Sequence, residues 1–109
     1  MCGRIRSKGR VFSLGQKIPH SKGESSWEGF AREESLSSKW LSKGWEEVTI
    51  EASSFCEKQS WFQVPPSSQI AGVVSPPTGG ESELRIMTRP AGSEVAKFHS
   101  REPRTIRRS

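Results

Sequence analysis

Hydrophobic residues recur with helical spacing in only one part of the chain, residues 26–43. At 3.6 residues per turn, one face of this segment collects apolar side chains and the opposite face collects charged ones. The apolar face and its continuation comprise Trp27, Phe30, Ala31, Leu41, Trp45 and Val48. Ser25 and Glu28 have the spacing of a capping box, which favours a helix start near Ser26. The pattern predicts a fluctuating amphipathic α-helix over about 26–43.

Alternating apolar and polar residues indicate two short strand fragments. Val48, Ile50 and Ala52 alternate with Thr49 and Glu51, which is the period of a β-strand. The segment 84–87 is a second fragment. The chain has no Asn-Gly or Asp-Gly pair to build a hairpin turn, so two such fragments do not predict a sheet.

The composition favours disorder over a packed fold. Only 31% of the residues are hydrophobic, and Gly, Pro and Ser make up about a third of the chain. Ordering the backbone costs about 1–2 kcal/mol per residue, and little apolar area is present to offset that cost. We therefore expect a mostly disordered, irregular chain with at most one short α-helix and strand fragments, and no stable globular fold.

The charges divide the chain into four segments. Residues 1–23 are basic and contain no acid, residues 24–58 are acidic and contain tryptophan, residues 59–80 form an uncharged Pro/Ser/Gly linker, and residues 81–109 form a basic tail. The net charge is +5. This arrangement favours transient attraction between the acidic middle and the two basic ends.

The two basic ends are the candidate binding residues. Clustered Lys and Arg attract polyanions by releasing counterions, without reading sequence. The candidates are Arg4, Arg6, Lys8, Arg10, Arg101, Arg104, Arg107 and Arg108. The tryptophans lie elsewhere in the sequence, which argues against a dedicated single-strand binding surface. Solvated tails without a ligand are the alternative.

No motif predicts catalysis, a cofactor or a metal. Cys2, His20, Cys56 and His99 are scattered along the chain, whereas structural zinc sites use closely spaced pairs. There is neither a Walker A motif nor a GxGxxG loop for phosphates. The spacing leaves open whether Cys2 and Cys56 form a disulfide. We predict no enzyme activity, no cofactor and no metal site.

The first four residues, Met1 to Arg4, resemble the start of the SOS-response-associated peptidase family, whose members crosslink to abasic sites. The resemblance implies that Cys2 becomes an N-terminal nucleophile. It ends at Arg4, and the family's later motifs contain Asn and Tyr, which this chain lacks. The alternative is that the tetrapeptide is coincidental.

Three hypotheses of function remain. The first is a small protein without biochemical activity, the product of a young or spurious reading frame. The second is a disordered protein whose basic termini weakly bind RNA, another polyanion or an anionic surface. The third is a mitochondrial protein, because residues 1–23 contain Arg, Lys and Ser but no acid. No apolar run is long enough for a secretory signal or a transmembrane helix, and the compartment remains open.

Overall fold

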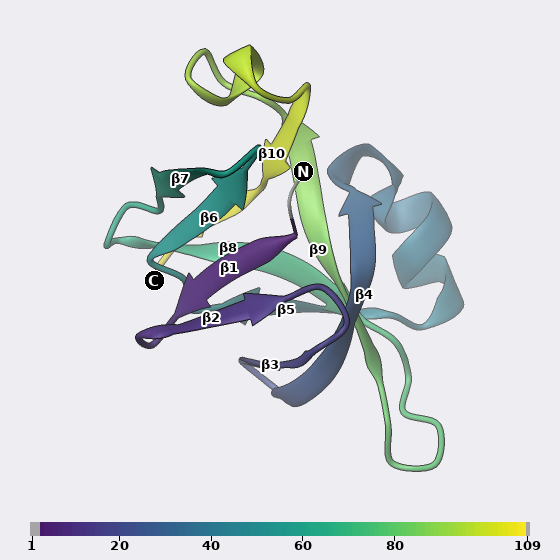
Figure 1. Cartoon of the computed structure of the whole chain (residues 1–109). Coiled ribbons are helices and arrows are strands. Elements are labelled where there is room, and N and C mark those ends of the chain that lie inside the picture. The colour runs from purple at the N-terminus through teal and green to yellow at the C-terminus, as the bar shows by residue number, and fades with distance from the viewer. Residues whose placement is uncertain (1–2, 109) are drawn as a thin grey trace.

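The chain folds into two β-sheets that share one hydrophobic core (Figure 1). The structure is a computed structural model and describes residues 3–108. Its radius of gyration is 13.1 Å, close to the value of about 13 Å for a folded chain of this length and far below about 30 Å for an unfolded one. The expectation of a mostly disordered chain without a stable globular fold is therefore wrong.

The smaller sheet is made of two antiparallel hairpins placed side by side. Its order is β2-β1-β6-β7. The strands are β1 (Arg4–Ser7), β2 (Arg10–Ser13), β6 (Ser54–Glu57) and β7 (Ser60–Gln63). The hairpins join through β1 and β6, where Arg4 lies opposite Cys56.

The larger sheet contains seven strands. Its main path is β11-β8-β9-β4-β3, while β10 also pairs with β9 and β5 also pairs with β8. The strands are β3 (Lys17–His20), β4 (Gly23–Arg32), β5 (Glu46–Ile50), β8 (Ser68–Val74), β9 (Glu83–Pro90), β10 (Arg101–Pro103) and β11 (Thr105–Arg107). β4 and β9 run parallel, and the other pairs are antiparallel.

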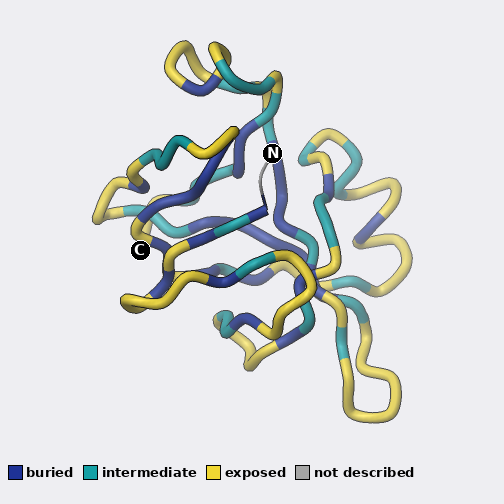
Figure 2. Tube along the Cα trace, in the orientation of Figure 1, coloured by how far each residue is buried: buried dark blue, intermediate teal, exposed yellow. Residues whose placement is uncertain are grey.

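The larger sheet is buried on both faces along its centre (Figure 2). One face contributes Ile70, Leu84 and Ile86 to the core that it shares with the smaller sheet. The other face contributes Val73 and Met87 to a second cluster. A strand that is covered on both faces has a continuous run of apolar residues in its sequence, without the alternation of a half-exposed strand. This explains why the alternation pattern does not predict β8.

The predicted α-helix over 26–43 is wrong. Residues 23–32 form β4, which pairs in parallel with β9 and buries Trp27 and Ala31. Three short helical turns follow, namely η1 (Glu33–Ser35), η2 (Leu36–Trp40) and η3 (Leu41–Lys43). These turns place Trp40 over the outer face of the larger sheet. Tertiary burial therefore overrides the local helical spacing.

The two strand fragments expected from alternation do exist, but as members of a sheet. The fragment around Val48 is β5, and residues 84–87 lie within β9. The segment 59–80, for which composition predicts a linker, contains β7 and the central strand β8. The basic N-terminal segment contains β1, β2 and β3.

No helix among residues 3–108 is long and apolar enough to cross a membrane, as expected from the sequence.

Candidate functional site

The basic residues of the N-terminal segment lie on the first hairpin. Arg4 and Arg6 belong to β1, Lys8 lies in the turn, and Arg10 begins β2. Because side chains alternate along a strand, Arg4 and Arg6 share the face of β1 that points away from the core residue Ile5. Arg10 instead stacks on Phe12, with 4.9 Å between its guanidinium carbon and the ring centroid.

Trp61 lies beside Arg4 and Arg6 and adds an aromatic surface to them. Arg4 is opposite Cys56 on β6, and Cys56 is opposite Trp61 on β7, so the three residues form one row across the sheet. The guanidinium carbons of Arg4 and Arg6 lie 5.7 and 4.6 Å from the Trp61 ring centroid. No carboxylate among residues 3–108 pairs with either arginine. We call this surface the Arg–Trp face.

Three of the four C-terminal arginines are held by glutamates of the acidic segment. Arg104 lies 3.5 Å from Glu33, and Arg108 lies 3.7 Å from Glu51. Arg101 forms two hydrogen bonds to the carboxylate of Glu34. The fourth, Arg107, is exposed on β11. The basic ends therefore do not merge into one cationic cluster.

A pocket lies where β4, β9 and β10 run side by side. It has a volume of about 360 Å³ and is lined by Phe30, Arg32, Thr88, His99 and Arg101. The register explains this grouping, because Arg32 is opposite Thr88 on β9 and Thr88 is opposite Pro103 on β10. Alternation then places Phe30, Arg32, Thr88 and Arg101 on the same face of the sheet. We call this site the Phe30 pocket.

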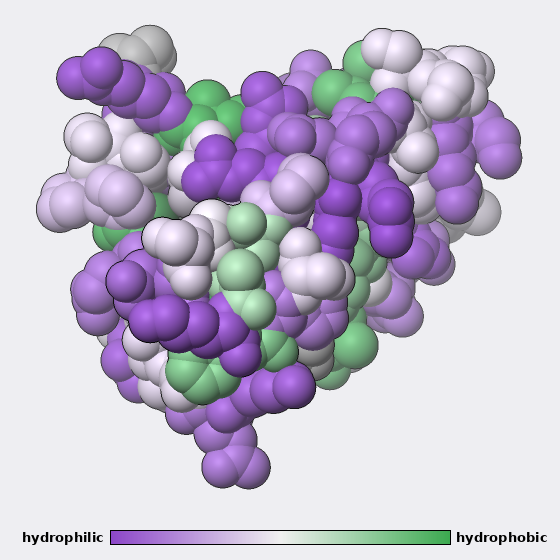
Figure 3. Space-filling model, turned by 90° about the horizontal axis from the view of Figure 1, so that it is seen from above, coloured by the Kyte–Doolittle hydropathy of each residue, from purple (hydrophilic) through white to green (hydrophobic). Residues whose placement is uncertain are grey.

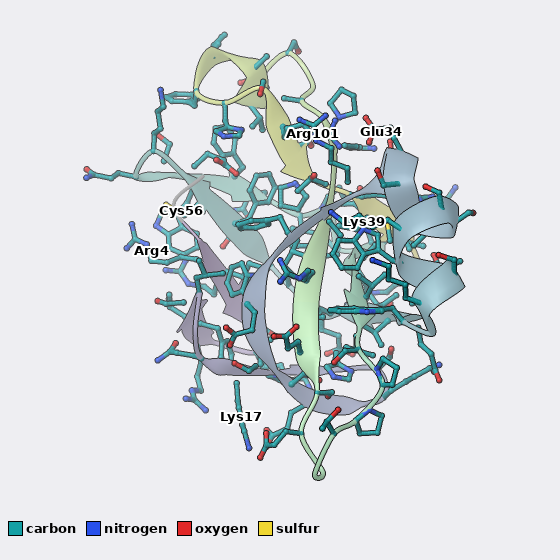
Figure 4. All side chains as sticks on the ribbon, turned by 90° about the vertical axis from the view of Figure 1, so that its right-hand side faces the viewer. Arg4, Lys17, Glu34, Lys39, Cys56 and Arg101 are labelled. Atoms are coloured by element: carbon teal, nitrogen blue, oxygen red, sulfur yellow. The ribbon has the colours of Figure 1, made fainter. Side chains whose placement is uncertain are left out.

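Arg101 is fixed at the wall of the Phe30 pocket by four hydrogen bonds. Its Nη1 and Nη2 donate to Glu34 at 2.8 and 2.7 Å, its Nη2 also donates to the Thr88 carbonyl at 2.8 Å, and its Nε donates to Thr88 Oγ1 at 3.3 Å. The Arg101 and Glu34 side chains point toward each other (Figure 4). These hydrogen bonds lower the pKa of Glu34 to about 2, so the charge of Arg101 stays balanced at neutral pH.

One ring nitrogen of His99, Nε2, has no hydrogen-bond partner among the described residues. The other ring nitrogen, Nδ1, lies 3.0 Å from the Arg101 backbone nitrogen and 3.2 Å from the Arg101 carbonyl oxygen. In the tautomer whose Nδ1 accepts the Arg101 N–H, the ring proton lies on Nε2. No hydrogen bond within residues 3–108 uses Nε2, so in that tautomer the Nε2–H is available to a ligand as a donor.

Glu57 is the one acid among residues 3–108 whose pKa is raised. It ends β6, is fully buried, and has its pKa raised to about 7, first because of burial and also because Glu102 lies nearby. Its face of β6 is the one opposite to Cys56. Continuing the β1–β6 register by one residue brings Gly3 opposite Glu57.

The candidate metal ligands do not converge in the described chain. Residues 3–108 contain no group of three His, Cys or Glu side chains suited to a metal ion. His20 shares a hydrogen bond of 2.8 Å with Ser25, and Cys56 is buried in the smaller sheet. Cys56, the one cysteine among these residues, is disulfide-bonded. Cys2, the other cysteine of the sequence, lies outside the described residues.

No local sequence pattern identifies several of the residues that make up these sites. Trp61 lies far from the arginines in sequence and approaches them only through the β1–β6 pairing. Phe30 and Thr88 meet through the long-range β4–β9 pairing. The alternation of Arg4 and Arg6 with Ile5 is the one local signal, and it indicates an amphipathic strand.

Comparisons with protein-family models, with curated proteins and with solved structures gave no match. The functional argument therefore rests on the geometry.

Proposed function

We propose that the protein binds single-stranded nucleic acid through the Arg–Trp face. The observation that supports this function is the position of Trp61 beside Arg4 and Arg6 on the outer face of the smaller sheet. The sequence argument against single-strand binding was the separation of tryptophans from arginines, and the fold removes that separation.

The chemistry of the Arg–Trp face fits a flexible strand better than a duplex. Single-stranded nucleic acid is bound by aromatic side chains that stack on bases and by cations that contact phosphates. A sheet surface presents both at fixed spacing, and the net charge of +5 attracts the strand at long range. The ligand is accordingly a strand held without sequence reading.

The test is fluorescence anisotropy with a labelled oligonucleotide of about ten nucleotides, titrated over a range of salt concentrations. For single strands the log–log slope of affinity against salt is about −0.7 for each neutralised phosphate. Replacing both arginines, Arg4→Gln and Arg6→Gln, should therefore flatten the slope by about 1.4. Trp61→Leu should weaken binding by about 1–3 kcal/mol with little change in slope.

Arg107→Gln is the matched control, because Arg107 is exposed and lies on β11, outside the smaller sheet. The hypothesis of a chain without biochemical activity predicts that all variants behave alike. Equal affinities for the Arg–Trp variants and the Arg107 control, or binding that ignores salt, would refute the proposed function.

Glu57 supports a second candidate, a covalent adduct with an abasic site. Gly3, which follows Cys2 in the sequence, lies opposite this buried acid when the β1–β6 register is continued. A carboxyl group whose pKa is about 7 can give or take a proton at neutral pH. The resemblance at residues 1–4 implies an N-terminal thiol at Cys2, a residue outside the described chain. Cys56 is disulfide-bonded, so the candidate requires a reducing agent. In the arrangement that the resemblance implies, the exposed amine and the reduced thiol of Cys2 would add to the aldehyde carbon with loss of one water.

An oligonucleotide with one abasic site tests this candidate, on a denaturing gel and under reducing conditions. A covalent band should form with the aldehyde and not with an analogue that lacks it. Cys2→Ser should abolish the band, and Glu57→Gln should slow it. A band of equal intensity with the aldehyde-free analogue would exclude the adduct.

A further inference from the structure

We infer that the Phe30 pocket binds a nucleoside monophosphate, either free or as the terminal residue of a strand, with the base against Phe30 and the phosphate at Arg32 and His99. The choice of a nucleotide over other aromatic phosphates rests on the proposed function. The pocket itself is a separate site from the Arg–Trp face.

The size and shape of the pocket suit a ligand of this kind. Its volume of about 360 Å³ lies within the usual range of ligand pockets, about 300–1,000 Å³. Its walls come from three strands and from the segment that precedes β10, so the lining residues are held by the sheet. The face of the molecule drawn in Figure 3 mixes hydrophilic and apolar residues over its surface.

The polar groups of the pocket divide into fixed and available donors. Arg101 already donates four hydrogen bonds to Glu34 and Thr88, and the carboxylate of Glu34 balances its charge. Arg32 is exposed and forms no ion pair with any carboxylate of residues 3–108. Nε2 of His99 is also available, and it donates in the tautomer whose Nδ1 accepts the Arg101 N–H. The charges of Arg101 and Arg32 both act on the Glu34 carboxylate. Two cations and one carboxylate leave an excess positive charge, which together with a neighbouring donor suits a single phosphate group.

Phe30 supplies the aromatic wall. Its ring meets the Trp27 ring edge to face, with centroids 5.9 Å apart, so its orientation is fixed from behind. A half-buried ring whose remaining surface lines a pocket offers a platform for a planar base. An anion site alone would gain nothing from such a wall, and the ring therefore favours a base together with a phosphate.

The test is a nuclear magnetic resonance titration of the full chain with adenosine monophosphate, adenosine and inorganic phosphate. The nucleotide should shift the Phe30 ring, His99 imidazole and Thr88 amide signals, and should bind more tightly than adenosine or phosphate. Phe30→Leu, which keeps an apolar side chain toward Trp27, should weaken nucleotide binding about 5- to 150-fold. Arg32→Gln should weaken nucleotide and phosphate alike.

His99→Asn separates a ligand contact from a structural role, since the amide oxygen can still accept the Arg101 N–H while the ring donor is lost. Arg107→Gln is again the control and should change nothing. Phosphate binding as tightly as the nucleotide, or nucleotide affinity unchanged in Phe30→Leu and Arg32→Gln, would overturn the inference.

Two further arms separate this inference from the proposed function. Arg–Trp variants should leave mononucleotide affinity unchanged, so loss of strand binding alone counts only against the Arg–Trp face. Oligonucleotides with and without a terminal phosphate distinguish a strand end from a free nucleotide. Tighter binding of the phosphorylated strand, removed by Arg32→Gln, places the strand end in the pocket, and equal binding assigns the pocket to the free nucleotide.

Discussion

At the scale of single residues, the tight turns use side chains that rarely occupy left-handed backbone. Lys8 and Gly9 connect β1 to β2 with φ values of 51° and 79°, and Lys58 and Gln59 connect β6 to β7 with φ values of 45° and 71°. Two successive positive φ values are typical of the type I′ turn, for which Asn-Gly is preferred. The chain contains no Asn or Asp, so lysine and glutamine adopt this conformation at a cost.

Gln59→Gly should relieve this strain. Glycine adopts a positive φ without the clash of a Cβ atom, so we expect unfolding to become less favourable by about 1 kcal/mol. Chemical denaturation of both proteins measures the difference. Gln59→Ala is the control and should bring no gain, since alanine keeps the Cβ. An equal gain from both variants would show that the Gln59 side chain, not the backbone, causes the strain.

Glu57 should make stability depend on pH between about 4.5 and 7. Its pKa is raised to about 7 in the folded chain by burial, against about 4.5 ordinarily. A raised pKa contributes stability below pH 4.5, and this contribution is lost as the pH rises to about 7, because the folded state resists ionisation. Thermal unfolding at several pH values should show this decline.

Glu57→Gln carries no ionisable group and should flatten the decline between pH 4.5 and 7. Its melting temperature should exceed that of the parent chain most clearly above pH 7. A decline of the same size in the variant would assign the effect to another group.

At the scale of elements, the sequence predicts two strand fragments and misses the other strands. The alternation around Val48 predicts β5, and the predicted fragment 84–87 lies within β9. β1 is not among the predicted strands, although Ile5 alternates with Arg4 and Arg6. β8 has apolar residues on both faces, so its period is hidden. β4 satisfies a helical period as well, and only its pairing with β9 selects the strand.

The candidate sites show the same limit. The basic residues of β1 can be selected from charge alone, because Arg4 and Arg6 stand in an acid-free segment. The ion pair of Arg101 cannot be predicted in this way, because its partner Glu34 lies far from it in the sequence. Site residues that meet through strand pairing need the register, and the register follows from the burial of the whole sheet.

Gly72 in the middle of β8 should not tolerate a side chain. A Cβ there would lie 3.0 Å from Leu84 Cδ1 and 3.1 Å from the backbone oxygen of Arg85. Leu84 can shift, but the backbone of β9 is held by its own ladder. We expect Gly72→Ala to destabilise the fold by about 1–3 kcal/mol. Denaturant unfolding checks this, with Gln69→Ala on the same strand as the control. An unchanged midpoint for Gly72→Ala would mean that β8 and β9 can separate at this point.

At the scale of the whole molecule, ion pairs link the charge segments that the sequence separates. Glu34 and Glu33 hold Arg101 and Arg104, and Lys22 contacts Glu46. The transient attraction expected between the acidic middle and the basic ends is therefore a set of defined contacts. Because most of these side chains are exposed, each pair contributes only about 0–1 kcal/mol, and burial of the shared core stabilises the fold.

The molecule should accordingly unfold as one unit and depend little on salt. We expect dispersed amide and indole signals from Trp27, Trp40, Trp45 and Trp61, and a single melting transition followed by fluorescence and circular dichroism alike. Raising the salt concentration should shift the transition by only a few degrees, about what 1 kcal/mol produces. Narrow random-coil signals or a gradual melt would contradict the two-sheet fold.

The parallel pairing of β4 with β9 bears on how the chain emerges from the ribosome. Trp27 on β4 pairs with Leu84 on β9, and Arg4 on β1 pairs with Cys56 on β6. β4 and β1 therefore each have a partner strand that is synthesised more than fifty residues later. At about 5–20 residues per second, that delay is roughly 3 to 10 seconds. During it the nascent chain exposes unpaired strand edges and apolar residues that the finished molecule buries. Newly made copies should therefore be clients of general chaperones, and fast overproduction should send a large share of them into aggregates.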